Sequence, residues 1–308
     1  MNKFYQVAGH CFALDMPEDV CLRPLLFNYM PFEVASAGEI VFGMTVSMEG
    51  ADFAGALNNS LPREYPGTSI QVSEDGDFEI AIFPGNWANA TAMLSLSHDF
   101  SEGYLALLNR DDAFVRFSID TALMLQYAFA TADRSTLLLH ASVVVKDGMA
   151  YAFAGKSGTG KSTHSMLWMK HIPDTYLLND DNPVLRINEE GRVLMAGSPW
   201  SGKTPCYKQE TVPLAGIARL FQYNRNAIER LPLLEAYLAL GSSTSAFHVE
   251  TVARACMERV TDGIHRSIQD VIRAVPIYSL SCLPDADAAR LCFETMGARD
   301  KYVKISLF

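Results

Sequence analysis

The chain has 308 residues, of which 49% are hydrophobic and 19% charged, a globular composition for one large domain or two ordinary ones. Its net charge of -10 and its scattered Lys and Arg residues disfavour nucleic acids and anionic membranes as partners. The N-terminus lacks a sustained apolar run of the signal-peptide kind, and no stretch approaches the roughly 18 apolar residues of a membrane span. We therefore expect a soluble, cytoplasmic protein.

Six cysteines occur, and none belongs to a C-x-x-C pair, which argues against a zinc site. A chain of this length needs no disulfide to stabilise its core, so we expect reduced and mostly buried thiols. The cysteines are Cys11, Cys21, Cys206, Cys256, Cys282 and Cys292.

The first part of the chain, residues 1–134, predicts a β-rich N-terminal domain that ends in a helix. Short apolar or alternating runs are separated by turn signals such as Pro66-Gly67, Asp75-Gly76 and Pro84-Gly85. We find no constellation of chemically active residues here, and Asp111-Asp112 is typical of a solvated turn. The expected elements are strands at Glu39–Ser47, Ser69–Val72 and Phe78–Phe83, and a helix at Asp120–Asp133.

The second part, residues 135–308, alternates strands and helices. A β-branched strand at Leu137–Val145 precedes Asp147-Gly148, a strong hairpin signal, and the returning strand Met149–Ala154 leads into a glycine-rich loop. The further expected elements are a helix from Ser162 to about Lys170, strands at Tyr176–Leu178, Val184–Ile187, Val193–Ala196, Ile217–Gln222 and Pro276–Ser281, a helical region from about Arg230 to Ser267 with a break at Gly241–Ser243, and a helix at Asp285–Met296.

The glycine-rich loop carries the strongest motif. The stretch FAGKSGTGKSTH contains Gly155-x-x-x-x-Gly160-Lys161-Ser162, a complete phosphate-binding loop between a strand and a helix. Glycines let successive N–H groups face phosphate oxygens, lysine reaches the β- and γ-phosphates, and the serine hydroxyl ligates magnesium. The residues expected to hold the nucleotide are Gly155, Lys156, Ser157, Gly158, Thr159, Gly160, Lys161, Ser162 and Thr163.

The hairpin places a histidine beside this loop. If Asp147-Gly148 is a two-residue turn, Lys146 pairs with Met149, and His140 then lies opposite Gly155. A lone histidine in an apolar strand is more often a core residue, but this position favours a functional one. Imidazole exchanges protons near neutral pH, which suits proton transfer or a phosphate contact.

Two carboxylates, Asp180 and Asp181, end a strand 19 and 20 residues after Lys161. If that strand runs in the direction of the loop strand, both carboxylates emerge at the edge where the phosphates bind. One carboxylate can hold magnesium, and the other can take a proton from an attacking hydroxyl. Neighbouring residues of an extended strand point opposite ways, so the two need different roles.

The segment GSPWSGK, residues 197–203, is dense in glycine and contains two further candidates. Lys203 can neutralise a phosphate or an acidic substrate, and Trp200 can stack on a base or form a wall of the pocket. An ordinary surface loop with a packed tryptophan is an equally good reading of the same residues.

Three segments together, LLLHASVVV, AGKSGTGKST and LLNDDNPVL, resemble the catalytic domain of bacterial HPr kinase/phosphorylase. The resemblance covers about residues 135–225 and implies an α/β, phosphoenolpyruvate carboxykinase-like P-loop domain of mixed sheet and helices. The β-rich N-terminal domain that precedes it does not resemble the regulator domain of the bifunctional enzyme. It implies that His140, the loop and the aspartate pair line one site, with Asp180 as the base and Asp181 as a metal ligand, or the reverse. The segment ETVPLAGIARL loosely resembles the family's signature around a metal-linked glutamate, which makes Glu210 a candidate ligand. The 197–203 loop is similar to one in HPr kinase-related proteins without an assigned substrate.

These residues and the resemblance lead us to expect a magnesium-dependent kinase that transfers phosphate from ATP, or a related donor, to a hydroxyl. Its acceptor would be a small molecule or a peptide or protein serine, with Lys161, His140 and Asp180 as the catalytic residues. Two alternatives stay open: a non-catalytic nucleotide sensor that acts on a partner, and phosphorylase or carboxykinase chemistry in the same site. The sequence is also compatible with a homo-oligomer.

Overall fold

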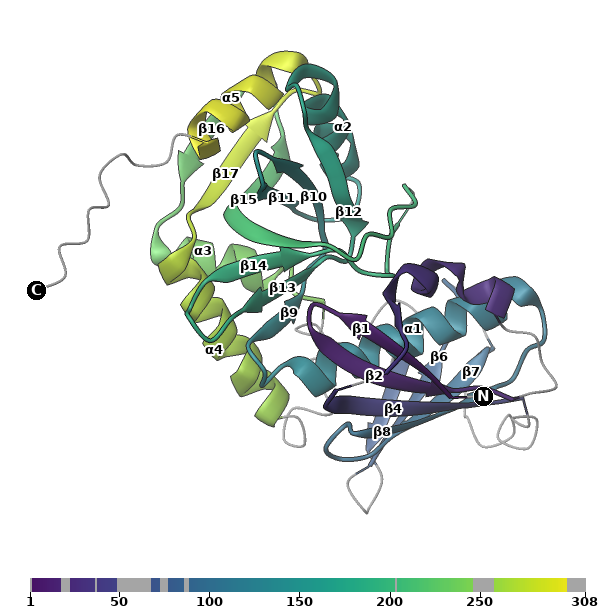
Figure 1. Cartoon of the computed structure of the whole chain (residues 1–308). Helices are drawn as coiled ribbons and strands as arrows, with labels where there is room; N and C mark the ends of the chain where they lie inside the picture. Colours follow the sequence, from purple (N-terminus) through teal and green to yellow (C-terminus); the bar gives the residue numbers. More distant parts are fainter. Residues whose placement is uncertain are drawn as a thin grey trace, which may run out of the picture.

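The computed structural model describes residues 2–17, 23–36, 38–48, 68–72, 77–85, 89–202, 204–245 and 258–297. Within them the chain forms two mixed β-sheets with helices packed against both, so the expected α/β class is confirmed. Figure 1 shows the sheets as two lobes, with helix α1 (Asp112–Thr131) lying along the first sheet.

The first sheet has eight strands in the order β3-β1-β2-β4-β8-β7-β6-β5. It contains antiparallel hairpins at both ends and parallel pairs of β4 with β2 and β8 in the middle. The strands predicted around residues 40, 70 and 80 are all present. Its strands are β1 (Asn2–Val7), β2 (His10–Asp15), β3 (Glu33–Val34), β4 (Ile40–Ser47), β5 (Thr68–Val72), β6 (Phe78–Ile82), β7 (Ala92–Leu96) and β8 (Glu102–Leu107). The 3-10 helix η1 (Arg23–Phe32) lies between β2 and β3 along the chain.

Helix α1 begins eight residues earlier than the sequence predicted. The interpretation of Asp111-Asp112 as a solvated turn was wrong, because the Asp111 side chain accepts a hydrogen bond from the backbone N–H of Ala113 and caps the helix. One face of α1 is buried against β4, β8, β7 and β6 and also contacts the second sheet. A single cluster of buried apolar side chains therefore extends across both sheets, from Phe12 to Ile277. The division into two domains stays a prediction.

The second sheet has nine strands, with the path β12-β10-β11-β15-β14-β13-β9 and with β17 and β16 joined through β15. Strand β11 is parallel to β15, β15 is parallel to β17, and β12 runs in the same direction because it is antiparallel to β10. The carboxyl ends of β11, β12, β15 and β17 therefore meet at one edge. The strands are β9 (Thr136–Leu138), β10 (Ala141–Lys146), β11 (Met149–Ala154), β12 (Tyr176–Asp181), β13 (Val184–Ile187), β14 (Val193–Ala196), β15 (Thr211–Gln222), β16 (Ala227–Arg230) and β17 (Ile277–Cys282).

Helices cover both faces of this sheet, as the alternation along β10 shows. Val143 and Val145 belong to the large cluster with α4 (Glu258–Ala274), whereas Val144 belongs to a smaller one with α2 (Lys161–His171) and α5 (Ala286–Gly297). Helix α3 (Leu233–Gly241) lies against α4, so the predicted helical region is in part correct, but it begins after β16. None of the helices in the described ranges is long and apolar enough to cross a membrane.

The predicted hairpin is confirmed, but the strand before it is not continuous. Asp147 and Gly148 both have positive φ, 51° and 71°, as a type I′ turn requires, and Lys146 pairs with Met149. The apolar run splits at His140 into β9, which pairs with β13, and β10, which pairs with β11 and β12. The chain thus changes partners at the histidine that the sequence placed beside the phosphate loop.

The thiol prediction is only partly met. Of the four cysteines in the described ranges, Cys11 and Cys292 are buried, whereas Cys206 and Cys282 are partly exposed, and all four are free. Cys21 and Cys256 lie outside the described residues.

The contact between α4 and the end of α1 depends on a glycine. A Cβ atom on Gly263 would lie 2.5 Å from the carbonyl oxygen of Ala132 and 2.8 Å from the backbone nitrogen of Asp133. Because both neighbours are backbone, we expect Gly263→Ala to lower the free energy of unfolding by about 1–3 kcal/mol. Urea unfolding measures this, with Gly38→Ala as the control, since a Cβ there meets nothing within 4 Å. Equal midpoints for the two variants would contradict the packing described.

A buried histidine links the two sheets and predicts a pH dependence of stability. The Nε2 atom of His10, on β2, lies 2.8 Å from the hydroxyl of Thr136 on β9. Burial, with the nearby Arg186 and Arg134, lowers the pKa of His10 from 6.5 to about 3. Below pH 6.5 the unfolded chain binds a proton there that the folded chain does not, so stability falls by up to about 1.4 kcal/mol per pH unit as the pH drops toward 3.

We therefore expect His10→Gln to unfold with a shallower pH dependence than the wild type between pH 6.5 and 4. The measurement is the urea midpoint as a function of pH. The exposed His98→Gln variant is the control and should keep the wild-type slope. A wild-type slope in His10→Gln would show that His10 does not carry this dependence.

Candidate phosphate-transfer site

The loop after β11 has the backbone that its glycines predict. Gly155, Gly158 and Gly160 have φ values of 147°, 81° and 97°, a region that other residues rarely adopt. A Cβ atom on Gly155 would approach the Thr159 hydroxyl to 2.9 Å and the Leu220 carbonyl to 3.3 Å. The loop is closed by the Thr159 backbone and hydroxyl, which both donate to the carbonyl of Lys156. It leads directly into α2, so the positive helix end faces the same space.

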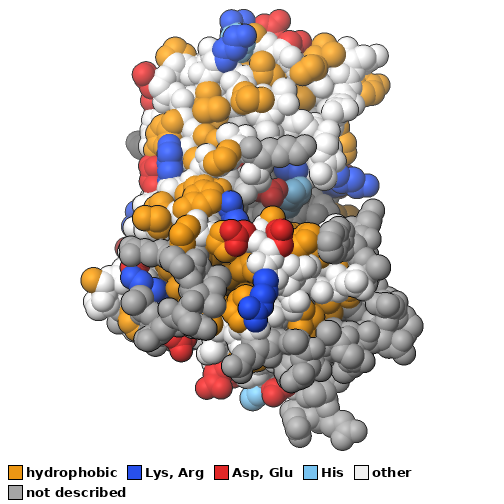
Figure 2. Space-filling model, turned by 90° about the vertical axis from the view of Figure 1, so that its right-hand side faces the viewer, with side chains coloured by type: hydrophobic (Ala, Val, Ile, Leu, Met, Phe, Trp, Pro, Cys, Tyr) orange, Lys and Arg blue, Asp and Glu red, His pale blue; other side chains and the backbone are white. Residues whose placement is uncertain are grey.

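A cavity of about 450 Å³ lies in front of this loop. Figure 2 shows histidine, acidic and basic side chains together at a recess about half-way up one face. The cavity contains most of the residues that the sequence singled out, brought together from the position just before β10, the phosphate loop, the start of α2 and the end of β12. Its lining residues are His140, Ser157, Gly158, Gly160, Lys161, Ser162, Thr163, Asp180, Asp181 and Gly202.

The lysine of the motif is buried, with only 8% of its surface exposed. Its Nζ atom lies 2.8 Å from His140 Nε2 and donates to the carbonyls of Gly155 and Lys156 at 3.1 and 3.4 Å. Burial lowers the pKa of Lys161, and the charges of Asp181 and Asp180 oppose this shift. The ammonium group is thus held at the loop by neutral acceptors that a phosphate can replace.

The two carboxylates have different partners. Asp180 is buried, and its Oδ1 accepts a hydrogen bond of 2.9 Å from the hydroxyl of Ser162. Asp181 is partly exposed, and its Oδ1 lies 3.0 Å from His140 Nδ1. Since Lys161 donates to Nε2, the histidine donates from Nδ1, and Lys161, His140 and Asp181 form a continuous relay.

The backbone of Asp181 is strained, with a φ of 144° that non-glycine residues rarely adopt. The segment after β14 holds this conformation: Ser201 forms a β-bridge with Asp181, and the N–H of Gly202 donates to the Asp180 carbonyl. A Cβ atom on Gly202 would lie 3.0 Å from that of Asp181 and 3.2 Å from the Asp180 carbonyl oxygen, so a larger residue here would require the aspartate pair to shift. Sequence reasoning missed Ser201 and Gly202 as supports of the aspartate pair, although it singled out their loop.

Trp200 does not line the cavity. It is 5% exposed, its Nε1 donates to the Tyr29 hydroxyl at 2.9 Å, and its ring packs 5.1 Å from that of Tyr127. The proposed role of Trp200 in stacking on a base was therefore wrong, and the alternative of a packed tryptophan applies. It ties the loop to η1 and α1.

Three further candidate residues either do not line the cavity or lie outside the residues that the structure describes. The Glu210 carboxylate accepts a hydrogen bond from Tyr176, which begins β12, whereas the aspartate pair ends it. The structure therefore does not bring Glu210 to the cavity. The Lys156 side chain is exposed, and this residue does not line the cavity, although its backbone carbonyl accepts from Lys161. Lys203 lies outside the described residues.

The pair Ser162 and Asp180 fits a magnesium ion, because two oxygen atoms that both belong to the cavity lining lie 2.9 Å apart. The described residues contain no group of three or more His, Cys, Asp or Glu side chains suited to a metal. A magnesium ion does not need one, because it keeps several waters and binds substrate phosphates beside one or two carboxylates.

No protein-family model matches the chain, and no curated protein shows significant similarity to it.

Proposed function

We propose that this protein is a magnesium-dependent kinase of the HPr kinase-related kind, which transfers phosphate from a nucleoside triphosphate to a hydroxyl of a small molecule or a peptide serine. One observation carries the proposal. Both the Ser162–Asp180 pair and the Lys161–His140–Asp181 relay line a single cavity in front of a phosphate-binding loop. Binding alone needs the loop and Lys161, but it needs no relay that ends in a carboxylate.

The contacts favour the reverse of the roles that we first assigned to the aspartates. We propose that Asp180 and Ser162 hold the metal, because their oxygen atoms already lie together. When bound, the magnesium ion would neutralise part of the negative charge on the transferring phosphate.

His140 and Asp181 then carry the proton. When Lys161 turns to the phosphate, His140 Nε2 loses its donor and becomes free to accept the proton of the acceptor hydroxyl. Asp181 holds the ring through Nδ1 and stabilises the charge that forms on it.

The test is cleavage of ATP in a single turnover, with enzyme in excess and with magnesium either present or chelated. A pool of hydroxyl-bearing metabolites and short serine peptides serves as the acceptor. We expect cleavage that requires both magnesium and a component of the pool. Tight binding of ATP without cleavage under every condition would instead support a nucleotide sensor.

A further inference from the structure

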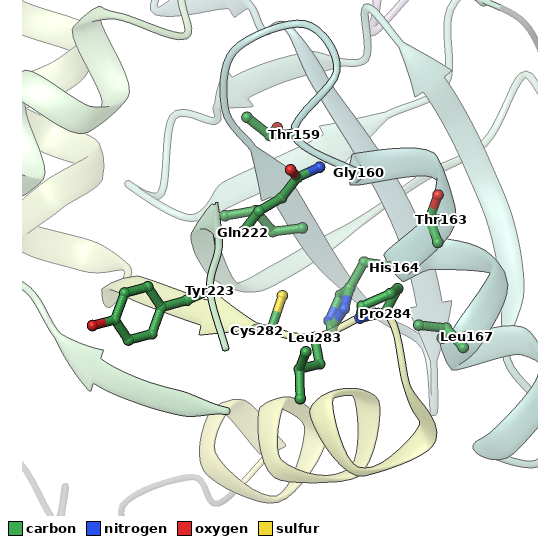
Figure 3. Close-up of a pocket in the computed structure, with 11 residues that line it drawn as sticks. Thr159, Gly160, Thr163, His164, Leu167, Gln222, Tyr223, Cys282, Leu283 and Pro284 are labelled. Atoms are coloured by element: carbon green, nitrogen blue, oxygen red, sulfur yellow. The ribbon is translucent and has the colours of Figure 1, made fainter. Parts of the chain in front are cut away.

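A second pocket, of about 300 Å³, lies next to the phosphate cavity. Its walls come from the phosphate loop, the first turns of α2 and the carboxyl ends of β15 and β17, as Figure 3 shows. The residues that line it are Thr159, Gly160, Thr163, His164, Leu167, Leu220, Gln222, Tyr223, Cys282, Leu283 and Pro284.

The lining of this pocket shows which end of a bound triphosphate would lie next to it. It shares Gly160 and Thr163 with the phosphate cavity, but none of His140, Asp180 and Asp181 belongs to its lining. Backbone amides of a phosphate loop hold the α- and β-phosphates, and the lysine holds the β- and γ-phosphates. A triphosphate with its γ end at the aspartate pair therefore directs its α end, and whatever is attached to it, toward this second pocket.

The lining of the pocket suits a flat, uncharged ring. Leu167, Leu220, Leu283 and Pro284 supply apolar surface, and burial raises the pKa of Cys282, so its thiol stays neutral. A phosphate group would lose its hydration here without a charged partner. The second pocket thus suits an uncharged group, whereas the phosphate cavity suits a charged one.

One polar group in this lining lacks a partner. His164 is 2% exposed, and its Nε2 accepts a hydrogen bond of 3.1 Å from Trp168 Nε1, so the proton of the neutral ring lies on Nδ1. Burial lowers the pKa of His164 to about 4, which keeps the ring neutral at pH 7. Within the described part of the chain, Nδ1 has no hydrogen-bond partner, and the atom is itself shielded from solvent, so a ligand reaches it only if the ring shifts.

The pocket wall is also joined to the loop that holds the phosphates. The Gln222 side chain, at the end of β15, donates to the Gly158 carbonyl at 3.1 Å. Figure 3 shows Gln222 beside the loop and His164 extending from α2 toward the ends of β15 and β17. This hydrogen bond fixes one wall of the pocket relative to the phosphate loop.

We infer that this pocket receives the base of a nucleoside triphosphate. The inference rests on the proposed function and deepens it, since it gives the base of the nucleotide donor a place in the structure. The nucleobase lies between the apolar side chains, and its phosphate chain runs past Thr163 to Lys161.

The experiment compares calorimetric binding of MgATP with that of magnesium tripolyphosphate, which has the same phosphate chain without base or ribose. We expect the wild type to bind ATP about tenfold to a hundredfold more tightly, the range given by stacking and burial of one base. Leu283→Trp, at a side chain that is 38% exposed, fills the pocket and should bring the ratio close to one. Leu238→Trp on α3, at a side chain that is 58% exposed, is the matched control and should keep the wild-type ratio.

Equal affinity of the wild type for ATP and tripolyphosphate would overturn the base pocket while leaving the phosphate site intact. A preference for ATP that persists in Leu283→Trp would overturn the location of the base. Failure of both compounds to bind the folded wild type would overturn the proposed function together with the pocket. Comparison of GTP, CTP and UTP in the same assay then identifies the preferred base.

Discussion

Replacement of Asp180 by asparagine is expected to lower magnesium-dependent phosphate transfer about 10³-fold, because a metal contributes several kcal/mol of transition-state stabilisation that this carboxylate would secure. The asparagine oxygen can still accept the hydrogen bond of Ser162, so the loop and the fold should be preserved. The measurement is the transfer rate as a function of magnesium concentration. The half-maximal concentration should rise in the variant, while affinity for metal-free nucleotide should stay close to that of the wild type.

Two further variants make this result specific. Asp174→Asn makes the same chemical change at an exposed residue just before β12 and should leave the magnesium dependence unaltered. Asp181→Asn should lower the rate and change its pH profile without a large change in the magnesium requirement, because Asp181 contacts His140. If the magnesium requirement rises in Asp181→Asn and not in Asp180→Asn, the roles of the two aspartates are the opposite of those proposed.

Replacement of Lys161 by methionine is expected to weaken nucleotide binding by about tenfold to a hundredfold, the value of a charge-assisted hydrogen bond. Turnover should fall by a further factor of about 10² to 10³, since an electrostatic donor at the transferring phosphate is also lost. Only 8% of Lys161 is exposed, and methionine replaces the buried apolar stem of the lysine without its charge. Lys170→Met, at an exposed position in the last turn of α2, is the control and should bind normally.

The pH dependence of binding gives a second readout for Lys161. Its pKa is lowered by burial, and only the protonated form attracts phosphate. Wild-type affinity should therefore decline as the pH rises through this lowered value, before an ordinary lysine would lose its proton. Lys161→Met should lack this decline. The same decline in both proteins would assign it to another group.

The sequence predicted the local geometry around the phosphate loop well, because each step depended on short-range rules. Asp147-Gly148 is specific for a type I′ turn, and the turn then fixed the register that brings His140 to the loop. The strand that carries Asp180 and Asp181 runs in the predicted direction and ends at the predicted edge.

Apart from the Asp111 helix cap, which is local, the features that the sequence analysis predicted wrongly or missed depended on distant contacts. The apolar run at Leu137–Val145 has no local signal for the break at His140, which arises because β9 and β10 pair with different strands. Trp200 is buried through a hydrogen bond to Tyr29, 171 residues away, which no local pattern could reveal. The support of Asp181 by Gly202 likewise depends on a close approach of two loops that the sequence does not encode locally.

The most direct test of the account follows the labelled γ-phosphate of ATP into a product. Wild type, Lys161→Met and Asp180→Asn are each incubated with the labelled nucleotide, magnesium and the pool of serine peptides and hydroxyl-bearing metabolites. The proposal predicts a phosphate ester that is formed by the wild type and lost in both variants. Label that appears only as inorganic phosphate, or an ester formed equally by all three proteins, would contradict the assignment of this cavity as a site of phosphate transfer.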